Sequence, residues 1–165
     1  MEDDQERPGA DAAVGGLLSP PRRGLTVGLV LTITLVAFEA LAVITILPAI
    51  KDDLDGIRLY GWATSAFQLG VMVGIVVAGG QADRRGPVPP FVAGIALFAA
   101  GLVVGGLAPT MLVLVLGRGL QGLGAGAVPA VAYAVIGRSY PEALRPRVFA
   151  VLSTAWVVPG LVGPV

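Results

Sequence analysis

The chain has 165 residues, of which 55% are hydrophobic and only 13% are charged, and its mean hydropathy is +0.83. A core of this size cannot bury so much apolar surface, and eleven basic and eleven acidic side chains cannot cover a water-facing surface, so the composition favours a membrane protein over a soluble domain. The zero net charge gives no sign of a nucleic-acid partner, and the absence of cysteine and histidine removes disulfides and the commonest zinc ligands, so we expect no metal and no cofactor.

The N-terminal stretch, residues 1–24, is acidic and then rich in glycine, alanine and proline, and we interpret it as a disordered cytosolic tail. Four apolar runs follow, each long enough to cross ~30 Å of hydrocarbon at ~1.5 Å per residue: residues 25–50, 60–82, 91–107 and 110–136. A fifth run covers residues 148–165 and is still apolar where the sequence stops, which indicates a truncated helix. The sequence therefore predicts an all-α membrane protein, with residues 25–165 forming a partial N-terminal transmembrane helix bundle.

Basic residues are unevenly distributed between the two ends of these runs. One end holds seven arginines: Arg22, Arg23, Arg84, Arg85, Arg138, Arg145 and Arg147. The other holds only Lys51 and Arg58, beside an acidic triplet that we interpret as a solvated loop: Asp52, Asp53 and Asp55. By the positive-inside rule the N-terminus is cytosolic, and we expect a multi-pass protein of the cell membrane, in bacteria the cytoplasmic membrane. A signal peptide ending near Ala42 is disfavoured, because the first apolar run is too long and carries Glu39.

Small residues recur at helical spacing in three of the runs. The second run carries a stripe of Gly70, Gly74 and Ala78, the third carries Gly101 and Gly105, and the fourth carries Gly122 and Gly126. Such stripes allow helix backbones to approach closely, so they predict a compact bundle.

A carboxylate and a guanidinium lie inside these apolar runs. Glu39 is eleven residues before the end of its run and Arg118 is eight residues after the start of the fourth, which places them about 16 and 12 Å below the same surface at ~1.5 Å per residue. Gln68 and Gln121 lie at a similar depth. Buried charges cost at least ~2.5–3.5 kcal/mol each, so we expect this polar layer to face a cavity or to pair internally, with the planar fork of the arginine holding the carboxylate and an amide together.

The segment "GRGLQG" (117–122) also matches the G-x-G-x-x-G fingerprint of dinucleotide-binding proteins. The residues that follow stay apolar on every side, whereas a dinucleotide-binding unit needs an amphipathic helix that covers a parallel sheet. The context therefore rejects nucleotide binding.

Three segments resemble motifs of the major facilitator superfamily. The segment "LVLGRGLQGLGAGA" (114–127) is similar to its fourth-helix motif, with Arg118, Gln121, Gly122 and Gly124 in place. The loop "GGQADRRGPVPP" (79–90) resembles its cytosolic signature between helices two and three, through Gly79, Ala82, Asp83, Arg84 and Gly86; it departs at Gln81, Pro87 and Val88. The segment "VVPGLVGPV" (157–165) resembles the start of the antiporter motif in the fifth helix, through Pro159, Gly163 and Pro164.

The resemblance implies the first four to five helices of a major facilitator N-terminal domain. An acid in the first helix followed by Leu47-Pro48 looks like the drug:proton antiporters, particularly the group with fourteen helices. This would make the chain part of a secondary active transporter rather than an enzyme, whose partners are a small-molecule substrate, protons, the lipid bilayer and a missing C-terminal half. Glu39 would accept the proton or a cation, with Arg118 as its electrostatic partner.

The resemblance also implies roles for the other positions. Gln68 and Gln121 would belong to the proton and substrate site. The cytosolic gate would include Gly79, Asp83, Arg84 and Gly86, and helix packing and the antiporter motif would use Gly122, Gly124, Pro159, Gly163 and Pro164.

Alternatives remain open at this stage. Glu39 and Arg118 could form a static ion pair, Asp83 and Arg84 a solvated turn, and the proline at 164 a simple kink. The chain could also be a small polytopic membrane protein that acts as a binding or assembly partner. The sequence does not identify the substrate, because specificity in this fold is shared between both halves.

Overall fold

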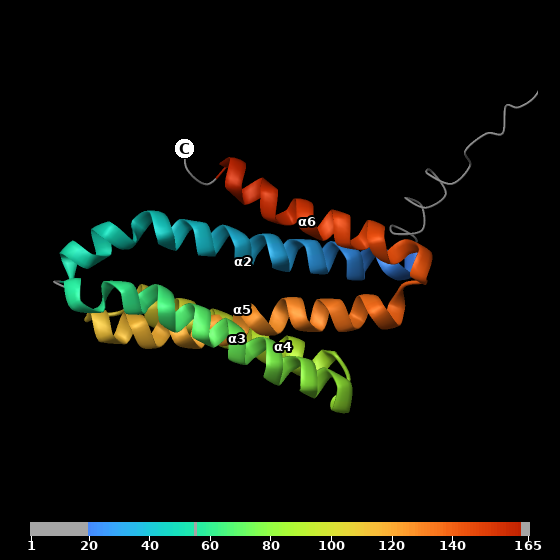
Figure 1. Ribbon diagram of the computed structural model, residues 1–165, viewed down its shortest axis with the longest axis horizontal. Coiled ribbons are helices and arrows are strands. Elements are labelled where there is room, and N and C mark those ends of the chain that lie inside the picture. Colours follow the sequence, from blue (N-terminus) through green and yellow to red (C-terminus); the bar gives the residue numbers. More distant parts are fainter. Residues whose placement is uncertain (1–19, 55, 163–165) are drawn as a thin grey trace, which may run out of the picture.

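The structure, a computed structural model, describes residues 20–54 and 56–162 and is helical almost throughout (Figure 1). Its helices are α2 (Pro20–Asp53), α3 (Tyr60–Arg85), α4 (Val88–Gly106), α5 (Met111–Ser139) and α6 (Arg145–Val162), with short 3-10 helices η1 (Ile57–Leu59) and η2 (Glu142–Leu144). No strand occurs in these described ranges, and α2, α3 with η1, α4 and α5 are long and apolar enough to cross a membrane. The predicted all-α membrane bundle is confirmed.

Several helices extend a few residues beyond the apolar runs from which they were predicted, while α4 ends and α5 begins within one residue of the predicted positions. Their ends are set by local backbone chemistry that hydropathy does not report. Gly86 ends α3 with φ +85°, a conformation that side chains disfavour, and its N–H donates to the carbonyl of Ala82 at 3.1 Å. At the start of α5 the hydroxyl of Thr110 accepts the N–H of Val113 at 3.4 Å, so Thr110 is the N-cap. Residues 1–19 of the predicted tail lie outside the described residues, so their disorder stays a prediction, whereas residues 20–24 form the start of α2.

The backbones of α3 and α5 touch along a line of glycines. A Cβ atom added to Gly74 would overlap the carbonyl of Leu123, and one added to Gly122 would overlap the carbonyl of Phe67. Gly70 and Gly126 are occluded in the same way by backbone atoms of the opposite helix. These four residues are the glycine seam, and they show that the small-residue stripes of the second and fourth runs face one another.

A second set of glycines packs α5 against α4. A Cβ at Gly124 would overlap backbone atoms of Gly94 and Phe98, and a Cβ at Gly101 would overlap the backbone of Gln121. Gly117 in turn approaches the backbone of Gly105. Because α5 has glycines on two faces, it fits between α3 and α4 and is the central helix of this group.

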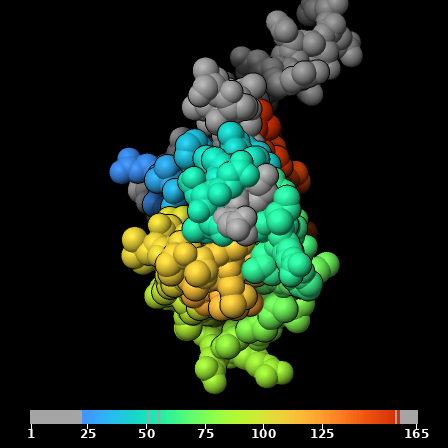
Figure 2. Space-filling view, turned by 90° about the vertical axis from the view of Figure 1, so that its left-hand side faces the viewer, coloured from blue at the N-terminus to red at the C-terminus, as the bar shows by residue number. Residues whose placement is uncertain are grey.

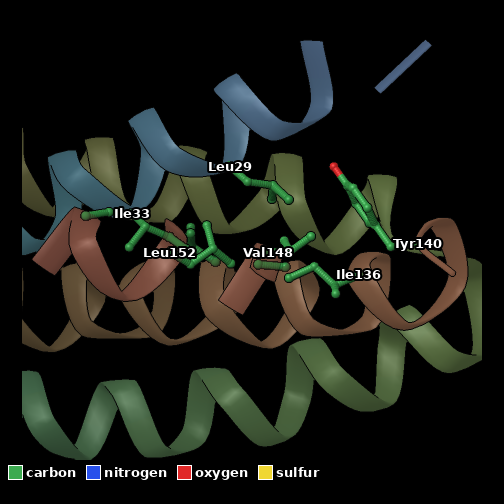
Figure 3. Packing of buried hydrophobic residues seen from close by; sticks show 9 residues of the cluster. Leu29, Ile33, Ile136, Tyr140, Val148 and Leu152 are labelled. Carbon is green, nitrogen blue, oxygen red and sulfur yellow. The ribbon is translucent and has the colours of Figure 1, made fainter. Parts of the chain in front are cut away.

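The helices α2 and α6 pack against each other beside α5 (Figure 1). Their shared core contains Leu29 and Ile33 from α2, Ile136 and Tyr140 from the end of α5, and Val148 and Leu152 from α6 (Figure 3). The hydroxyl groups of Thr26 and Tyr140 share a buried hydrogen bond of 2.7 Å beside this cluster. Large side chains, rather than glycines, fill the space here.

The opposite end of the bundle, where α2 ends and α3 and α5 begin, faces the viewer in Figure 2. A second cluster closes this end with Leu47, Ala63, Met111, Leu114 and Val115. Gly56 is buried there, because its Cα lies directly under the side chain of Met111. Together the two clusters place the middle of α2 beside the middle of α5.

Candidate functional site

Glu39 and Arg118 form a buried ion pair between α2 and α5. Nη1 of Arg118 donates to Oε1 of Glu39 at 2.6 Å, and only 5% of Arg118 and 8% of Glu39 are exposed. Leaving either charge without its partner in an apolar bundle would be costly, so the pair offsets the desolvation of both groups. The two side chains that the sequence placed at one depth therefore meet directly.

Gln121 completes the group one helical turn along α5 from Arg118. The same Nη1 donates to Oε1 of Gln121 at 2.5 Å, and Gln121 is 2% exposed. The guanidinium holds the carboxylate and the amide together, and a single nitrogen, Nη1, donates to both. Three buried atoms of this group have no hydrogen-bond partner among the described residues: Oε2 of Glu39, Nε of Arg118 and Nε2 of Gln121.

The face of the guanidinium rests on an aromatic ring that the sequence argument missed. Cζ of Arg118 lies 4.1 Å from the ring centroid of Phe67 in α3, a cation–π geometry. The depth count selected its neighbour Gln68, but depth alone does not say which face of a helix a residue occupies. Phe67 lies three residues before Gly70, on the same face of the helix as the stripe of Gly70 and Gly74, so the stripe carried the signal that the depth count lacked.

Gln68 is exposed and does not join the buried group. It lines a cavity of about 130 Å³ between α2, α3 and α5, whose other lining residues are apolar: Ile33, Val36, Ala40, Phe67, Val71, Ala125, Val128 and Pro129. Pro129 has no N–H, so it cannot make the intrahelical bond that the carbonyl of Ala125 would otherwise accept. The cavity therefore combines an apolar wall with the amide of Gln68.

The residues of the expected gate lie at the end of α3. Asp83 pairs with Arg138 at 3.4 Å, with 77% and 48% of the two side chains exposed, while Arg84 is exposed on the same turn. Gly86 has the positive φ described above, and Gly79 has open space where a Cβ would be. The arrangement connects the ends of α3 and α5 through one solvated ion pair.

The remaining predicted positions divide between packing and the end of the chain. Gly122 and Gly124 contact α3 and α4 respectively, so they are packing residues of the central helix. Pro159 lies within α6, and its side chain is outside the described part of the structure. Gly163 and Pro164 lie outside the described residues altogether, so the antiporter motif stays a prediction.

Comparison with known proteins identifies relatives for most of the chain. Residues 29–165 match the model of the family described as "Major Facilitator Superfamily". The chain is 33% identical over 132 residues to the Mycobacterium tuberculosis protein named "Probable multidrug-efflux transporter Rv1634", covering 80% of this chain and 28% of the relative. It is 35% identical over 158 residues to "Uncharacterized MFS-type transporter Rv1877" of the same species, covering 95% and 23%.

A third relative comes from a different organism. The chain is 31% identical over 140 residues to "Multidrug transporter protein MdtP" of Bacillus subtilis, covering 85% of this chain and 26% of the relative. The chain thus spans about a quarter of the length of the curated relatives it matches. The family model covers most of the sequence, including all the motifs on which the resemblance was based, and the chain belongs to the major facilitator superfamily.

Proposed function

We propose that this chain is the N-terminal part of a proton-coupled exporter of small molecules or drugs in the cell membrane, and that Glu39 exchanges a proton for a substrate. The names of two of the relatives, Rv1634 and MdtP, support the class of substrate, since they describe multidrug transporters. These relatives are about three times as long as this chain, which supports a further half that completes the transport pathway.

The observation that carries the proposal is the buried group of Glu39, Arg118 and Gln121. Burial of a carboxylate inside an apolar bundle is expensive, and such residues usually mark a substrate or proton pathway. Oε2 of Glu39 has no partner among the described residues, so the carboxylate keeps an atom available for a proton or a ligand. Phe67, which contacts Arg118, also lines the cavity between α2, α3 and α5.

A single carboxylate next to a cavity can couple two ligands. In its charged form Glu39 attracts Arg118 or a cationic substrate, and in its protonated form it attracts neither strongly. Loading the proton therefore favours release of the cation, and loading the cation favours release of the proton. This competition is the thermodynamic requirement of an antiporter, in which each ligand reduces the affinity for the other.

We further propose that the N-terminus is cytosolic. The start of α2, the end of α3 and the end of α5 lie at one end of the bundle, and this end carries most of the arginines (Figure 1). Single-cysteine labelling tests the orientation cleanly because the chain has no native cysteine. An impermeant reagent should modify Ile57→Cys and spare Val88→Cys in intact cells, two exposed positions at opposite ends, and the reverse pattern would overturn the orientation.

The decisive experiment compares the full-length protein that carries this sequence with its Glu39→Gln variant. Glutamine keeps the shape and most hydrogen bonds of glutamate but carries no charge, so folding should survive while substrate-induced proton release is lost. Release is measured on detergent-purified protein with a pH-sensitive dye. Glu142→Gln serves as a matched control and should release protons as the wild type does, because it makes the same change at a carboxylate whose side chain is 90% exposed and lies outside the buried group.

Equal proton release from the wild type and Glu39→Gln would contradict the proposal and favour a static ion pair. The 165-residue chain expressed alone should insert without transporting, because alternating access needs a second half that rocks against the first. Saturable substrate flux in vesicles that contain only this chain would contradict that part of the proposal.

A further inference from the structure

The guanidinium of Arg118 contacts side chains from three helices, α2, α3 and α5. Nη1 donates to Glu39 of α2 and to Gln121 of α5, while the ring of Phe67 from α3 lies 4.1 Å from Cζ. Hydrogen bonds fix the guanidinium within its plane, and the aromatic ring fixes the plane itself. Of the three contacts, only the one with Phe67 is also part of the cavity wall.

The position of Phe67 is itself tightly determined. Its side chain is 8% exposed, and its backbone carbonyl lies against Gly122, where a Cβ would overlap it. The backbone of Phe67 therefore cannot shift without disturbing the glycine seam, and the ring is held from a fixed point of α3. A molecule that enters the cavity meets this ring, so cavity occupancy and the plane of the guanidinium are mechanically connected.

We propose that Phe67 is the positioning residue that couples the cavity to the ion pair: its ring holds the guanidinium of Arg118 against Glu39, and a ligand in the cavity acts on the ion pair through that ring. The part of the ligand that contacts the cavity wall is apolar or aromatic, since the lining is apolar apart from Gln68. This inference rests on the proposed function, because it assumes that Glu39 exchanges a proton.

The positions of the other charged residues show which groups can influence the ion pair of Glu39 and Arg118. In the described parts of α2, α3, α4, α5 and α6, Glu39 and Arg118 are the charged residues inside the apolar stretches, and the other charges lie at helix ends. A change at Phe67 therefore acts on Glu39 through Arg118, and not through another titratable group of these helices.

The test replaces Phe67 of the full-length protein with phenylalanines that carry one, two or three ring fluorines. Fluorine withdraws electron density from the face of the ring and weakens a cation–π contact, yet it changes the volume little. We expect the number of protons released per substrate, and the pH profile of transport, to change stepwise with the number of fluorines. Phe67→Leu should reduce coupled transport by about tenfold, and Phe67→Tyr should restore it towards the wild type.

Phe98 provides a matched control. It is 6% exposed and belongs to the same buried cluster as Phe67, but it packs against Gly124 on the other face of α5. Fluorination at Phe98 should leave proton release unchanged. Equal effects at both positions, or no effect at Phe67, would overturn the inference and reduce Phe67 to a packing residue.

Wild type and Glu39→Gln are measured in the same series, which separates the two proposals. If these two release equal numbers of protons, the proposed function fails. If release depends on Glu39 but is insensitive to fluorination at Phe67, only the role of Phe67 fails. The fluorinated variants keep the shape of the ring, so the test remains available even if Phe67→Leu does not fold.

Discussion

The two interfaces of α5 with α3 and with α2 are built in opposite ways. Against α3 the contact is backbone to backbone, through the glycine seam of Gly70, Gly74, Gly122 and Gly126. Against α2 the contact is made by side chains, and it includes a buried ion pair and one wall of a cavity. The interface between α3 and α5 has no room for an added atom at these glycines. The interface between α2 and α5 contains groups that can change charge or hydrogen-bond partner.

The difference between the two interfaces distinguishes residues that maintain the fold from residues whose contacts can change during function. A glycine seam has a single arrangement, because any added atom meets a carbonyl or an amide of the other helix. An interface of side chains can change its contacts while the helices stay folded. In this chain the polar group that we assign to transport belongs to the second kind, and its aromatic neighbour Phe67 comes from the first.

The largest expected effect is at the glycine seam. Gly74→Val should destabilise the full-length protein by about 3 kcal/mol or prevent its folding, because the new side chain overlaps the carbonyl of Leu123. Thermal unfolding in detergent measures the change. Gly80→Val, on the same helix with open space at the Cβ, is the control and should cost less than about 1 kcal/mol. Similar losses at both positions would show that the seam is not specifically packed.

The next effect is at the ion pair, where function should fall and stability should not. Arg118→Lys keeps a positive charge that can donate to Glu39 and Gln121, but an ammonium group lacks the planar face that rests on Phe67. We expect transport to fall at least about tenfold while membrane expression stays near normal. Unchanged transport in a substrate assay would assign Arg118 to packing.

A smaller effect is expected where α2 meets the end of α5. Tyr140→Phe removes the buried hydrogen bond to Thr26 and should lower the free energy of unfolding by about 1 kcal/mol. Tyr133→Phe is the matched control, because that side chain is 57% exposed and should tolerate the loss of its hydroxyl. A larger loss at Tyr133 would contradict the assignment of this hydrogen bond to the interface.

The smallest effect on stability is expected at the end of α3. Asp83→Asn breaks the ion pair with Arg138, but both side chains are solvated, so the loss should stay below about 0.5 kcal/mol. A reduced transport rate at unchanged unfolding temperature would support the gate proposed for this loop. Unchanged transport would favour the solvated-turn interpretation.

The sequence predicted the helices and the depth of the buried group in the membrane better than it predicted which face of a helix each residue occupies. Counting residues placed Glu39 and Arg118 at one depth, because the rise of a helix is fixed. The same count selected Gln68 in place of Phe67, because the rise per residue gives the depth of a side chain but not its position around the helix axis. It also could not show that the glycines of α5 pack against two different helices, which depends on the tertiary arrangement. The roles of these residues stay predictions.

The ends of the helices show a second limit. Apolar runs indicate where lipid surrounds a helix. The caps set where the helical hydrogen bonds begin and end: Thr110 starts α5 and Gly86 ends α3. These two caps are short-range signals, and Gly86 was selected from the sequence only through a family motif. The predicted start of the fourth run coincides with the cap at Thr110, whereas the predicted end of the second run is three residues before the end of α3, where Gly86 stops the helix.

The central position of α5 also has a consequence for how the chain is made. In its apolar stretch 67% is buried inside the protein, against 28%, 28% and 22% for α2, α3 and α4, so the environment of α5 is mostly protein rather than lipid. A helix that carries Arg118 and so many glycines is a poor candidate for insertion on its own. It is synthesised after α2, α3 and α4, the helices that supply Glu39, Phe67 and its glycine partners, so these partners precede it along the chain. The order of the elements along the chain is therefore also a workable order of assembly.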